Sequence, residues 1–351
     1  MSIANLVNTF TEGVTYKIFT SDYDLNNEPI DVETDKWIPF NDHTDVYYCS
    51  KNNRTISTLK EQLRITSPDV IFINGIYSPY FNLFPAVLGT CKKIISVRGM
   101  LHPGAISQKA FKKEFYITLL KLLRLHKHSC FHASDHQEEI FIKNVFGKNA
   151  NVYVAPNFPR TFSYQPVYTK TSGTLKLVTI ALVSPMKNYL NVLEAMMNVK
   201  ESITYNIYGP IKDASYWNEC KKVINNLPKN IQVIYHGDIH PKNVEQALST
   251  SEVYIQPSKS ENFGHSIYEA LAAGKPVITS NAVPWKHLNE SGAGKNINPE
   301  NIAELSSAIN FFADMDQQDY NKWSTGAAAY ARNAVDPEKI KTAYKQMFQL
   351  S

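Results

Sequence analysis

The chain has 351 residues, of which 43% are hydrophobic and 19% charged, a composition typical of a folded globular protein. This length allows two domains with separate hydrophobic cores. The formal net charge of +4 is too small to indicate a nucleic-acid partner by itself. Four scattered cysteines, without a C-x-x-C pair or a Cys/His metal spacing, argue against a disulfide framework or a zinc site and favour a reducing compartment.

The sequence shows neither a signal-peptide pattern nor an apolar run of about 18 residues. We therefore expect a cytoplasmic protein without a membrane-spanning segment.

The first half alternates apolar strands with helices, an order typical of a parallel α/β sheet. A Rossmann-type half usually begins with a strand and a glycine-rich turn, whereas this chain begins with a helix, so the first strand is expected to be missing or truncated. The expected helices span residues 1–10, 55–65, 108–128 and a stretch ending at 146, and the expected strands span 15–20, 70–73, 93–97, a stretch beginning at 131, and 152–157.

Arg98 follows the strand 93–97, where the carboxyl end of a parallel strand commonly faces a ligand. Its planar, forked side chain suits a donor phosphate or an acceptor anion, although it could equally be a structural arginine bonded to a loop carbonyl. His102 is a weaker candidate for a base. Asp22 and Asp24 form a D-x-D pattern, but after a strand such aspartates usually belong to a turn rather than to a metal site.

The helix 108–128 has two faces. One is predicted to be a core stripe, and the other is basic with interleaved apolar residues, which suits either an anionic membrane surface or plain solvent. The predicted core residues are Phe111, Phe115, Thr118, Leu119, Leu122 and Leu125, and the other face has Lys109, Lys112, Lys113, Arg124 and Lys127 with Tyr116, Leu120 and Leu123.

The pattern of the second half predicts another doubly wound unit, which follows a linker rich in Pro, Thr, Ser and Tyr. We expect domains at 1–160 and 175–335, a linker at 161–174, and a C-terminal helix at 336–351 that crosses back to the first domain. The expected strands are 175–182, 203–208, 231–235, 253–257 and 275–279, and the expected helices are 188–199, 214–225, 241–249, one opened by Gly264, 302–312, 318–334 and 336–350.

The stretch 253–280 organises this half. It reads as a buried strand, a loop, a helix opened by Gly264, and a second strand. The free amides of Gly264, His265 and Ser266, together with the helix dipole, predict a phosphate site at the helix start. Glu261 precedes the helix and Glu269 lies within it, so one carboxylate could face a sugar and the other a ribose diol. A capped surface helix with a solvated Glu269 is the alternative for the E-x7-E spacing taken alone.

Together, E-N-F-G-H-S-I-Y-E at 261–269, E-A-L-A-A-G-K-P-V-I at 269–278, and S-P-M-K-N at 184–188 resemble the signature of glycosyltransferase family 4, the retaining group 1 enzymes. R-G-M-L at 98–101 resembles a bacterial surface-polysaccharide subgroup. The resemblance implies a GT-B fold: two Rossmann-like, doubly wound parallel-sheet domains facing a central cleft.

Carried onto this sequence, the resemblance implies catalytic roles for Glu261, Lys187 and Arg98. Lys187 would neutralise the departing diphosphate, although a plain surface lysine is the alternative. The donor-binding residues that the resemblance implies are Glu269, Asn262, Phe263, Gly264, His265, Ser266, Asn188 and Ile239, with Pro284-Trp285 shaping the sugar pocket or simply packing.

The function that the resemblance implies is retaining transfer of a sugar from a nucleotide-diphosphate donor to a saccharide or lipid-linked acceptor, without a metal or other cofactor. Its expected setting is bacterial cell-surface polysaccharide synthesis, in the cytoplasm or at the inner face of the plasma membrane. The expected lack of the first strand and two departures from the family's pattern, Leu182 for its arginine and Asn74 for its histidine, leave open a non-catalytic sugar-nucleotide-binding scaffold. A sugar-nucleotide epimerase is a further alternative, for which the sequence shows no dedicated acid/base pair.

Overall fold

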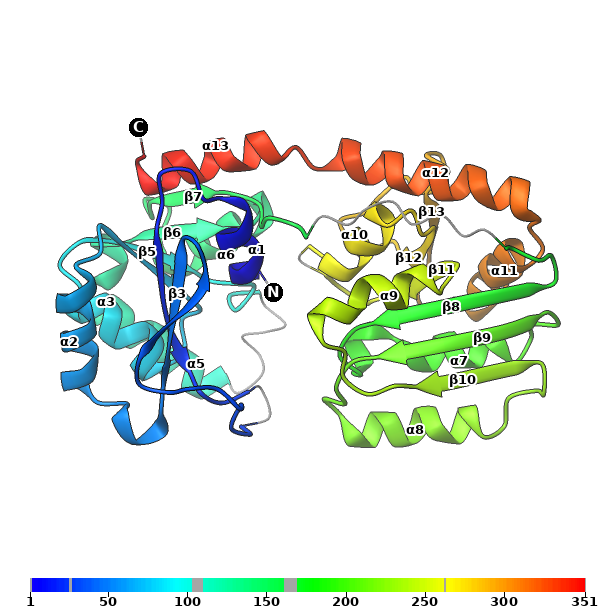
Figure 1. Ribbon diagram of the computed structural model, residues 1–351, viewed down its shortest axis with the longest axis horizontal. Helices are drawn as coiled ribbons and strands as arrows, with labels where there is room; N and C mark the ends of the chain where they lie inside the picture. Colours follow the sequence, from blue (N-terminus) through cyan, green and yellow to red (C-terminus); the bar gives the residue numbers. More distant parts are fainter. Residues whose placement is uncertain (1, 25–26, 103–109, 161–168, 262, 351) are drawn as a thin grey trace. The chain divides into compact units, whose positions relative to one another are not determined.

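The computed structural model describes residues 2–24, 27–102, 110–160, 169–261 and 263–350. The chain divides into two compact units (Figure 1). The first comprises Met1–Phe158 with Pro337–Ser351, and the second comprises Pro159–Asp336.

The first unit contains two sheets. A parallel sheet has the strand order β4-β5-β6-β7, formed by Val70–Asn74, Lys92–Ser96, Cys130–Ala133 and Val152–Val154. A three-stranded sheet has the order β1-β3-β2, formed by Tyr16–Ser21, Thr44–Cys49 and Trp37–Asn41.

The hairpin of β2 and β3 is antiparallel and was not predicted. Its connection, Asp42-His43, lacks the Asn-Gly or Asp-Gly pair that marks a two-residue hairpin turn. Pro39 also argues against a strand, because proline cannot donate to a ladder. The structure resolves this conflict by placing β2 at the edge of the sheet, where a proline is tolerated.

The helices of the first unit follow the predicted order, with α3 (Phe84–Leu88) as an addition. Thr55 caps α2 by accepting a hydrogen bond from the amide of Thr58, and Asp135 caps α6 in the same way through Glu138. In α13, Tyr344 packs on Phe158, with ring centroids 5.0 Å apart. The described helices of this unit are α1 (Ser2–Thr9), α2 (Ile56–Thr66), α3, α5 (Ala110–Leu122), α6 (His136–Phe146) and α13 (Pro337–Phe348).

The orientation predicted for the helix 108–128 is wrong. Its helix α5 ends at Leu122, because Arg124 adopts a left-handed backbone conformation (φ 52°). Ile117 and Leu120 are buried and Leu119 is half-buried against the core, whereas Phe111 is 85% exposed and two further apolar residues of the predicted core stripe are exposed as well. Those exposed residues are Phe115 and Leu122, while Leu125 is buried in the turn beyond the helix.

The second unit is built on a six-stranded parallel sheet with the order β10-β9-β8-β11-β12-β13. The predicted parallel α/β fold is thereby confirmed for this half. The strands are β8 (Thr174–Ile180), β9 (Ser202–Tyr208), β10 (Ile231–Tyr235), β11 (Val253–Gln256), β12 (Val277–Ser280) and β13 (Gly294–Ile297), of which β13 was not predicted.

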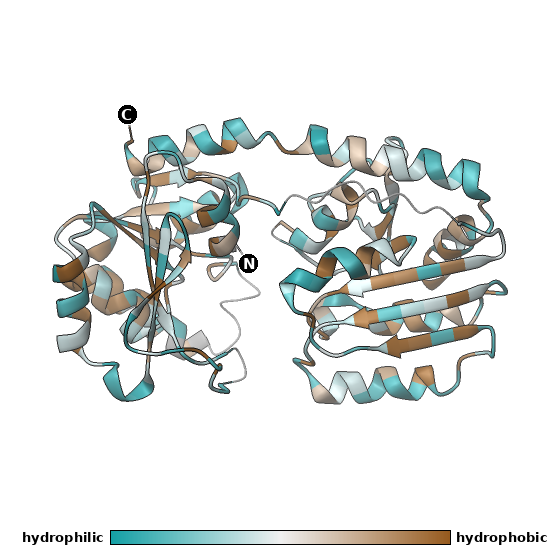
Figure 2. Cartoon of the chain, in the orientation of Figure 1, coloured by the Kyte–Doolittle hydropathy of each residue, from teal (hydrophilic) through white to brown (hydrophobic). Residues whose placement is uncertain are grey.

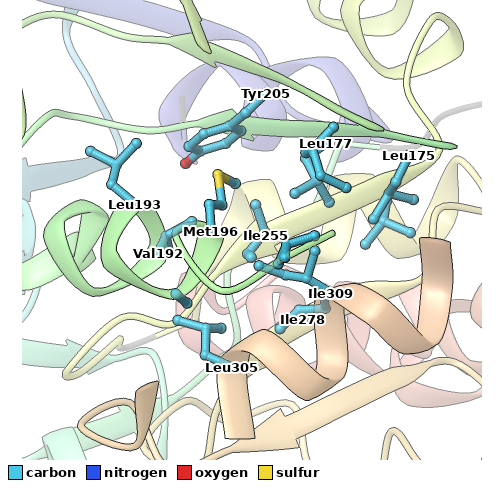
Figure 3. Packing of buried hydrophobic residues seen from close by; sticks show 14 of the residues in the cluster. Leu175, Leu177, Val192, Leu193, Met196, Tyr205, Ile255, Ile278, Leu305 and Ile309 are labelled. Atoms are coloured by element: carbon cyan, nitrogen blue, oxygen red, sulfur yellow. The ribbon is translucent and has the colours of Figure 1, made fainter. Parts of the chain in front are cut away.

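Strands β11 and β12 are buried throughout, which is why they read as nearly continuous apolar runs rather than as alternating patterns. Figure 2 shows hydrophobic residues along strands β8 to β10, as well as on strands and helices elsewhere in both units. Between the sheet and three helices lies a large hydrophobic core, where Leu177, Tyr205 and Ile255 meet Met196 and Ile309 (Figure 3).

Those three helices are α7 (Tyr189–Met196), α8 (Ala214–Ile224) and α11 (Ile302–Ala313). Helix α9 (Val244–Ser249) contacts β8, and helix α10 (His265–Ala272) contacts β11 and β12 as well as α12 (Gln317–Ala334). The sheet is therefore covered by helices on both faces, as a doubly wound unit requires.

Candidate functional site

The strand order of the second unit defines where its site lies. From β8 the chain proceeds through β9 to β10 on one side, and β11, β12 and β13 follow on the other. The direction of winding thus reverses between β8 and β11, and ligands of open α/β sheets bind at the carboxyl ends of the strands at such a switch point. The loops 181–188 and 257–264 leave β8 and β11 at this point.

Lys187 and Glu261 lie in these two loops and form an ion pair between Nζ and Oε1. Their side chains are only 19% and 12% exposed, so the pair is largely removed from solvent. The amide of Lys259 also donates to the carbonyl of Met186 at 2.9 Å, which ties the loops together. The structure thus brings together two of the three predicted catalytic residues.

A buried polar network positions Glu261. Its Oε1 accepts hydrogen bonds from Gln256 Nε2 and from Ser258 Oγ, both at 2.8 Å. Gln256 Oε1 in turn accepts from Tyr254 OH at 2.6 Å and from Ser266 Oγ at 3.1 Å. Because the polar groups of this network form hydrogen bonds with one another, their burial carries little free-energy penalty. The network therefore holds the Glu261 carboxylate in one orientation.

Sequence reasoning missed this network, because Tyr254 and Gln256 belong to a strand interpreted only as an apolar run. A signal was present: Gln256 is a polar residue in a fully buried strand, and such a residue requires hydrogen-bond partners.

Gly264 caps α10 in a left-handed conformation (φ 74°) that glycine adopts without strain. A Cβ atom there would lie 3.2 Å from Trp285 Nε1. Trp285 is buried and packs edge-on against Phe263, with centroids 5.0 Å apart. The start of α10 follows the loop of Glu261 directly, and His265 and Ser266 form its first turn.

Glu269 is 2% exposed, and its Oε1 has no hydrogen-bond partner among the described residues. Burial raises the pKa of this carboxyl from 4.5 to about 7, while the positive charge of Arg160 acts in the opposite direction. A solvated surface position, the alternative considered for Glu269, is therefore wrong. The described residues thus leave the buried Oε1 of Glu269 without a hydrogen-bond donor.

The remaining predicted donor residues are placed as follows. Asn188 is buried in a left-handed conformation, and its Nδ2 donates to the carbonyl of Pro299 at 2.9 Å, so its side chain braces the loop. Ile239 lies in the loop after β10, half-buried. Asn262 lies outside the described residues.

Arg98 belongs to the first unit, after β5, with a left-handed backbone (φ 53°). Its Nε donates to Asn74 Oδ1 at 2.6 Å and its Nη1 to Asn157 Oδ1, and the group lies 5.9 Å from the ring of Phe72. Burial lowers the pKa of the guanidinium. Nη2 has no partner within the described part of the chain, so a cation sits between neutral amides with one donor unused.

Beside Arg98, His132 is fully buried between Ser96 Oγ (2.8 Å) and the carbonyl of Ala155 (2.7 Å). Burial lowers the pKa of this imidazole to about 4, and the charge of Arg98 adds to the effect. His132 is therefore a neutral core histidine. His102, the weak candidate base, packs edge-on against Phe141 at 5.2 Å.

Asp22 forms an ion pair with Arg54 at 2.7 Å, and Asp24 accepts the amide of Glu28 at 2.8 Å within a turn. Among the described residues, His, Cys, Asp and Glu form no group of three that could hold a metal ion. In the same residues, no helix is long and apolar enough to span a bilayer.

Comparison with known proteins now adds to this geometry. Residues 163–330 match the family model of glycosyl transferases group 1. A stretch of 109 residues is 30% identical to alpha-monoglucosyldiacylglycerol synthase of Streptococcus pneumoniae, and it covers 30% of this chain and only 24% of that relative.

Two solved structures resemble the chain at low sequence identity. Sucrose-phosphate synthase of Thermosynechococcus elongatus has a TM-score of 0.71 at 16% identity, with 100% of this chain and 92% of that one covered. Alr3699/HepE of Anabaena, in complex with UDP and glucose, has a TM-score of 0.68 at 18% identity, with 88% and 86% covered.

The two Rossmann-like units thus constitute the GT-B fold of glycosyltransferases, as predicted. Within this fold, residues 163–330 are similar to the glycosyl transferases group 1 family, and the match covers just under half of the chain.

Proposed function

We propose that the protein is a retaining glycosyltransferase that moves a sugar from a nucleoside-diphosphate donor to a saccharide or lipid-linked saccharide. The observation that carries this proposal is the largely buried pair of Lys187 and Glu261 at the switch point of a parallel sheet. A similar fold in Alr3699/HepE, whose structure contains UDP and glucose, supports a nucleotide-sugar donor.

During transfer, the bond between the anomeric carbon and a diphosphate oxygen breaks, and negative charge develops on the departing phosphate. Lys187 and the start of α10 would stabilise that charge, and stabilisation of developing charge is usually the largest contribution to such catalysis. The acceptor hydroxyl forms the new bond on the same face of the sugar, and its proton passes to the departing phosphate oxygen. In this scheme, the configuration is retained without a separate base or a metal ion.

Glu261 would accept hydrogen bonds from the donor sugar, since the network beneath it fixes its orientation. Glu269 would accept the two ribose hydroxyls, which supply the donors that its buried Oε1 lacks. The backbone near Ile239 would contact the nucleobase. Arg98, with its unused Nη2 donor, would bind an anionic group of a substrate.

We further propose that α5 docks on an anionic lipid surface at the cytoplasmic face of the membrane. Phe111, Phe115 and Leu122 are exposed on this helix, and Lys121 and Arg124 are exposed beside them. Exposed apolar residues flanked by cations suit the interface of an anionic bilayer. A lipid-linked acceptor in bacterial surface-polysaccharide synthesis fits this placement.

Thermal unfolding with UDP, GDP, ADP and their sugars tests the donor site first. One of these nucleotides should stabilise the protein by about 2.7 kcal/mol at a hundred times its dissociation constant. Glu269→Ala should abolish that shift. The enzyme proposal also requires turnover of the stabilising sugar nucleotide with an acceptor extract; binding without turnover in that assay would instead favour a non-catalytic scaffold.

A further inference from the structure

A pocket of about 650 Å³ opens in the first unit, at the amino ends of β5, β6 and β7. Lys92 and Lys93 begin β5, Cys130 begins β6, and residues 149–151 precede β7. Arg98 follows the opposite, carboxyl end of β5. The pocket is therefore distinct from the Arg98 cluster and belongs to a different unit from Lys187 and Glu261.

The lining of this pocket is strongly basic. It contains no aspartate or glutamate, so the positive charges repel one another without compensation inside the pocket. The basic residues of the lining are Lys92, Lys93, Lys127, Lys148, His126 and His128.

Two of the lysines are anchored and two are available. Lys92 Nζ donates to the carbonyl of Met347 at 2.7 Å, and Lys93 Nζ donates to that of Gly89 at 3.1 Å. Lys127 and Lys148 are exposed, and neither side chain takes part in an ion pair or hydrogen bond within the described residues. Their ammonium groups are thus free to converge on a ligand.

Ser129 provides an independent indication. It lines the pocket with only 6% of its surface exposed, and its Oγ has no hydrogen-bond partner in the described part of the chain. His126 Nδ1 likewise has no hydrogen-bond partner among the described residues. A buried polar atom without a partner lowers the stability of a protein, and a ligand oxygen that bonded to it would remove that penalty.

We propose that this pocket is a binding site for a phosphate-bearing anion, held by the ammonium groups of Lys127 and Lys148 and by the hydroxyl of Ser129. Its volume exceeds the needs of a single phosphate and suits a diphosphate or a phospholipid head group. Both sources present the same anionic oxygens. The site goes beyond the proposed transfer reaction, because it shares no residue with the candidate donor site.

Inorganic pyrophosphate is the soluble probe, and Cys130 provides a local readout because it lines the pocket. Pyrophosphate should slow the alkylation of Cys130 by iodoacetamide, as measured by mass analysis of the peptide that contains Cys130. Because this readout reports on the pocket alone, pyrophosphate bound near Lys187 does not contribute to it. Replacing both lysines, Lys127→Ala with Lys148→Ala, should raise the pyrophosphate concentration required about tenfold or more.

The matched control removes two exposed lysines elsewhere in the same unit, Lys51→Ala with Lys60→Ala, and should behave as wild type. Ser129→Ala keeps the charge and removes only the unpaired hydroxyl. It should leave the free protein at least as stable and still weaken protection by pyrophosphate.

Vesicles separate the two sources of phosphate. Phosphatidylglycerol mixed with phosphatidylcholine in equal amounts should bind the protein in a Ser129-dependent manner if the ligand is a lipid head group, whereas protection by pyrophosphate alone assigns a soluble anion. The proposal is overturned if neither probe depends on Ser129 and the lysine pair, or if the control pair has the same effect.

Discussion

Each unit of the chain places a cation at the carboxyl ends of parallel strands, but the two cations have opposite surroundings. Lys187 is paired with Glu261, which is itself held by Gln256 and Ser258. Arg98 has amide oxygens as its hydrogen-bond partners and one unused donor. A paired charge must exchange partners before it binds a ligand, whereas an unpaired one gains a counterion outright. The first arrangement suits selective binding and the second suits attraction of anions.

The largest expected effect is on the paired site. Glu261→Ala should lower turnover about 10²- to 10³-fold, because it would remove the proposed contact to the donor sugar and would leave Lys187 without its partner. Steady-state kinetics with the nucleotide sugar found by thermal unfolding measures this. Glu290→Ala, at an exposed glutamate, is the control. Unchanged turnover in Glu261→Ala would falsify the catalytic assignment.

The next effect concerns pH and the buried carboxyl of Glu269. Its pKa is about 7 in the folded protein against 4.5 without burial, so the folded state holds an extra proton between these values. Stability should therefore fall as pH rises through this window. Glu269→Gln should remove that fall. At pH above about 7, its free energy of unfolding should exceed that of the wild type by roughly 3 kcal/mol.

Urea unfolding at acidic and alkaline pH tests this expectation, with the exposed Glu290→Gln as the reference. Parallel pH profiles for wild type and Glu269→Gln would contradict it. Nucleotide binding near neutral pH should also release a proton, because ribose hydroxyls favour the ionised carboxylate.

A smaller effect is expected for the unpaired cation. Arg98→Met should weaken the binding of an anionic substrate roughly 10- to 100-fold, as seen in its KM, because one charged hydrogen-bond donor is lost. Arg98→Lys keeps the charge but cannot reach Asn74 and Asn157 at once, so it should rescue binding only partly. Equal KM values for all three proteins would show that Arg98 is a structural residue.

The smallest effect is expected at the exposed face of α5. Phe115→Ser with Leu122→Ser should weaken binding to anionic vesicles about fivefold, since each side chain inserts only in part. Folding should not suffer, because both side chains are already exposed. Ile65→Ser with Val87→Ser changes two other exposed apolar residues of the same unit as a control. Identical losses for the two pairs would rule out a specific docking face.

The sequence predicted the second unit well because its local signals agree. A buried apolar run, Gly264 at the helix start and Pro276 after the helix all mark the same strand–helix–strand unit. The pairing of Lys187 with Glu261 follows from the reversal of winding between β8 and β11, which spacing along the chain cannot show.

The first unit was harder to predict from the sequence, because its local sequence patterns conflict with one another. Helix α5 has apolar residues on two sides, and periodicity alone does not tell which side meets the core. The structure buries Ile117 and Leu120 and exposes Phe111 and Phe115. Likewise, the raised pKa of Glu269 depends on packing by residues distant in sequence, so no motif could predict it.

The Lys187–Glu261 pair also requires that a ligand of the site satisfy both residues at the same time. A bare phosphate that captured Lys187 would leave Glu261 largely buried without a counterion, and a neutral sugar that approached Glu261 would compete with a cation already in place. Only a molecule that offers an anionic oxygen to one residue and hydroxyl donors to the other satisfies both at once. The paired site would thus discriminate against fragments of its proposed donor, including free phosphate, before any contact with the nucleobase is made.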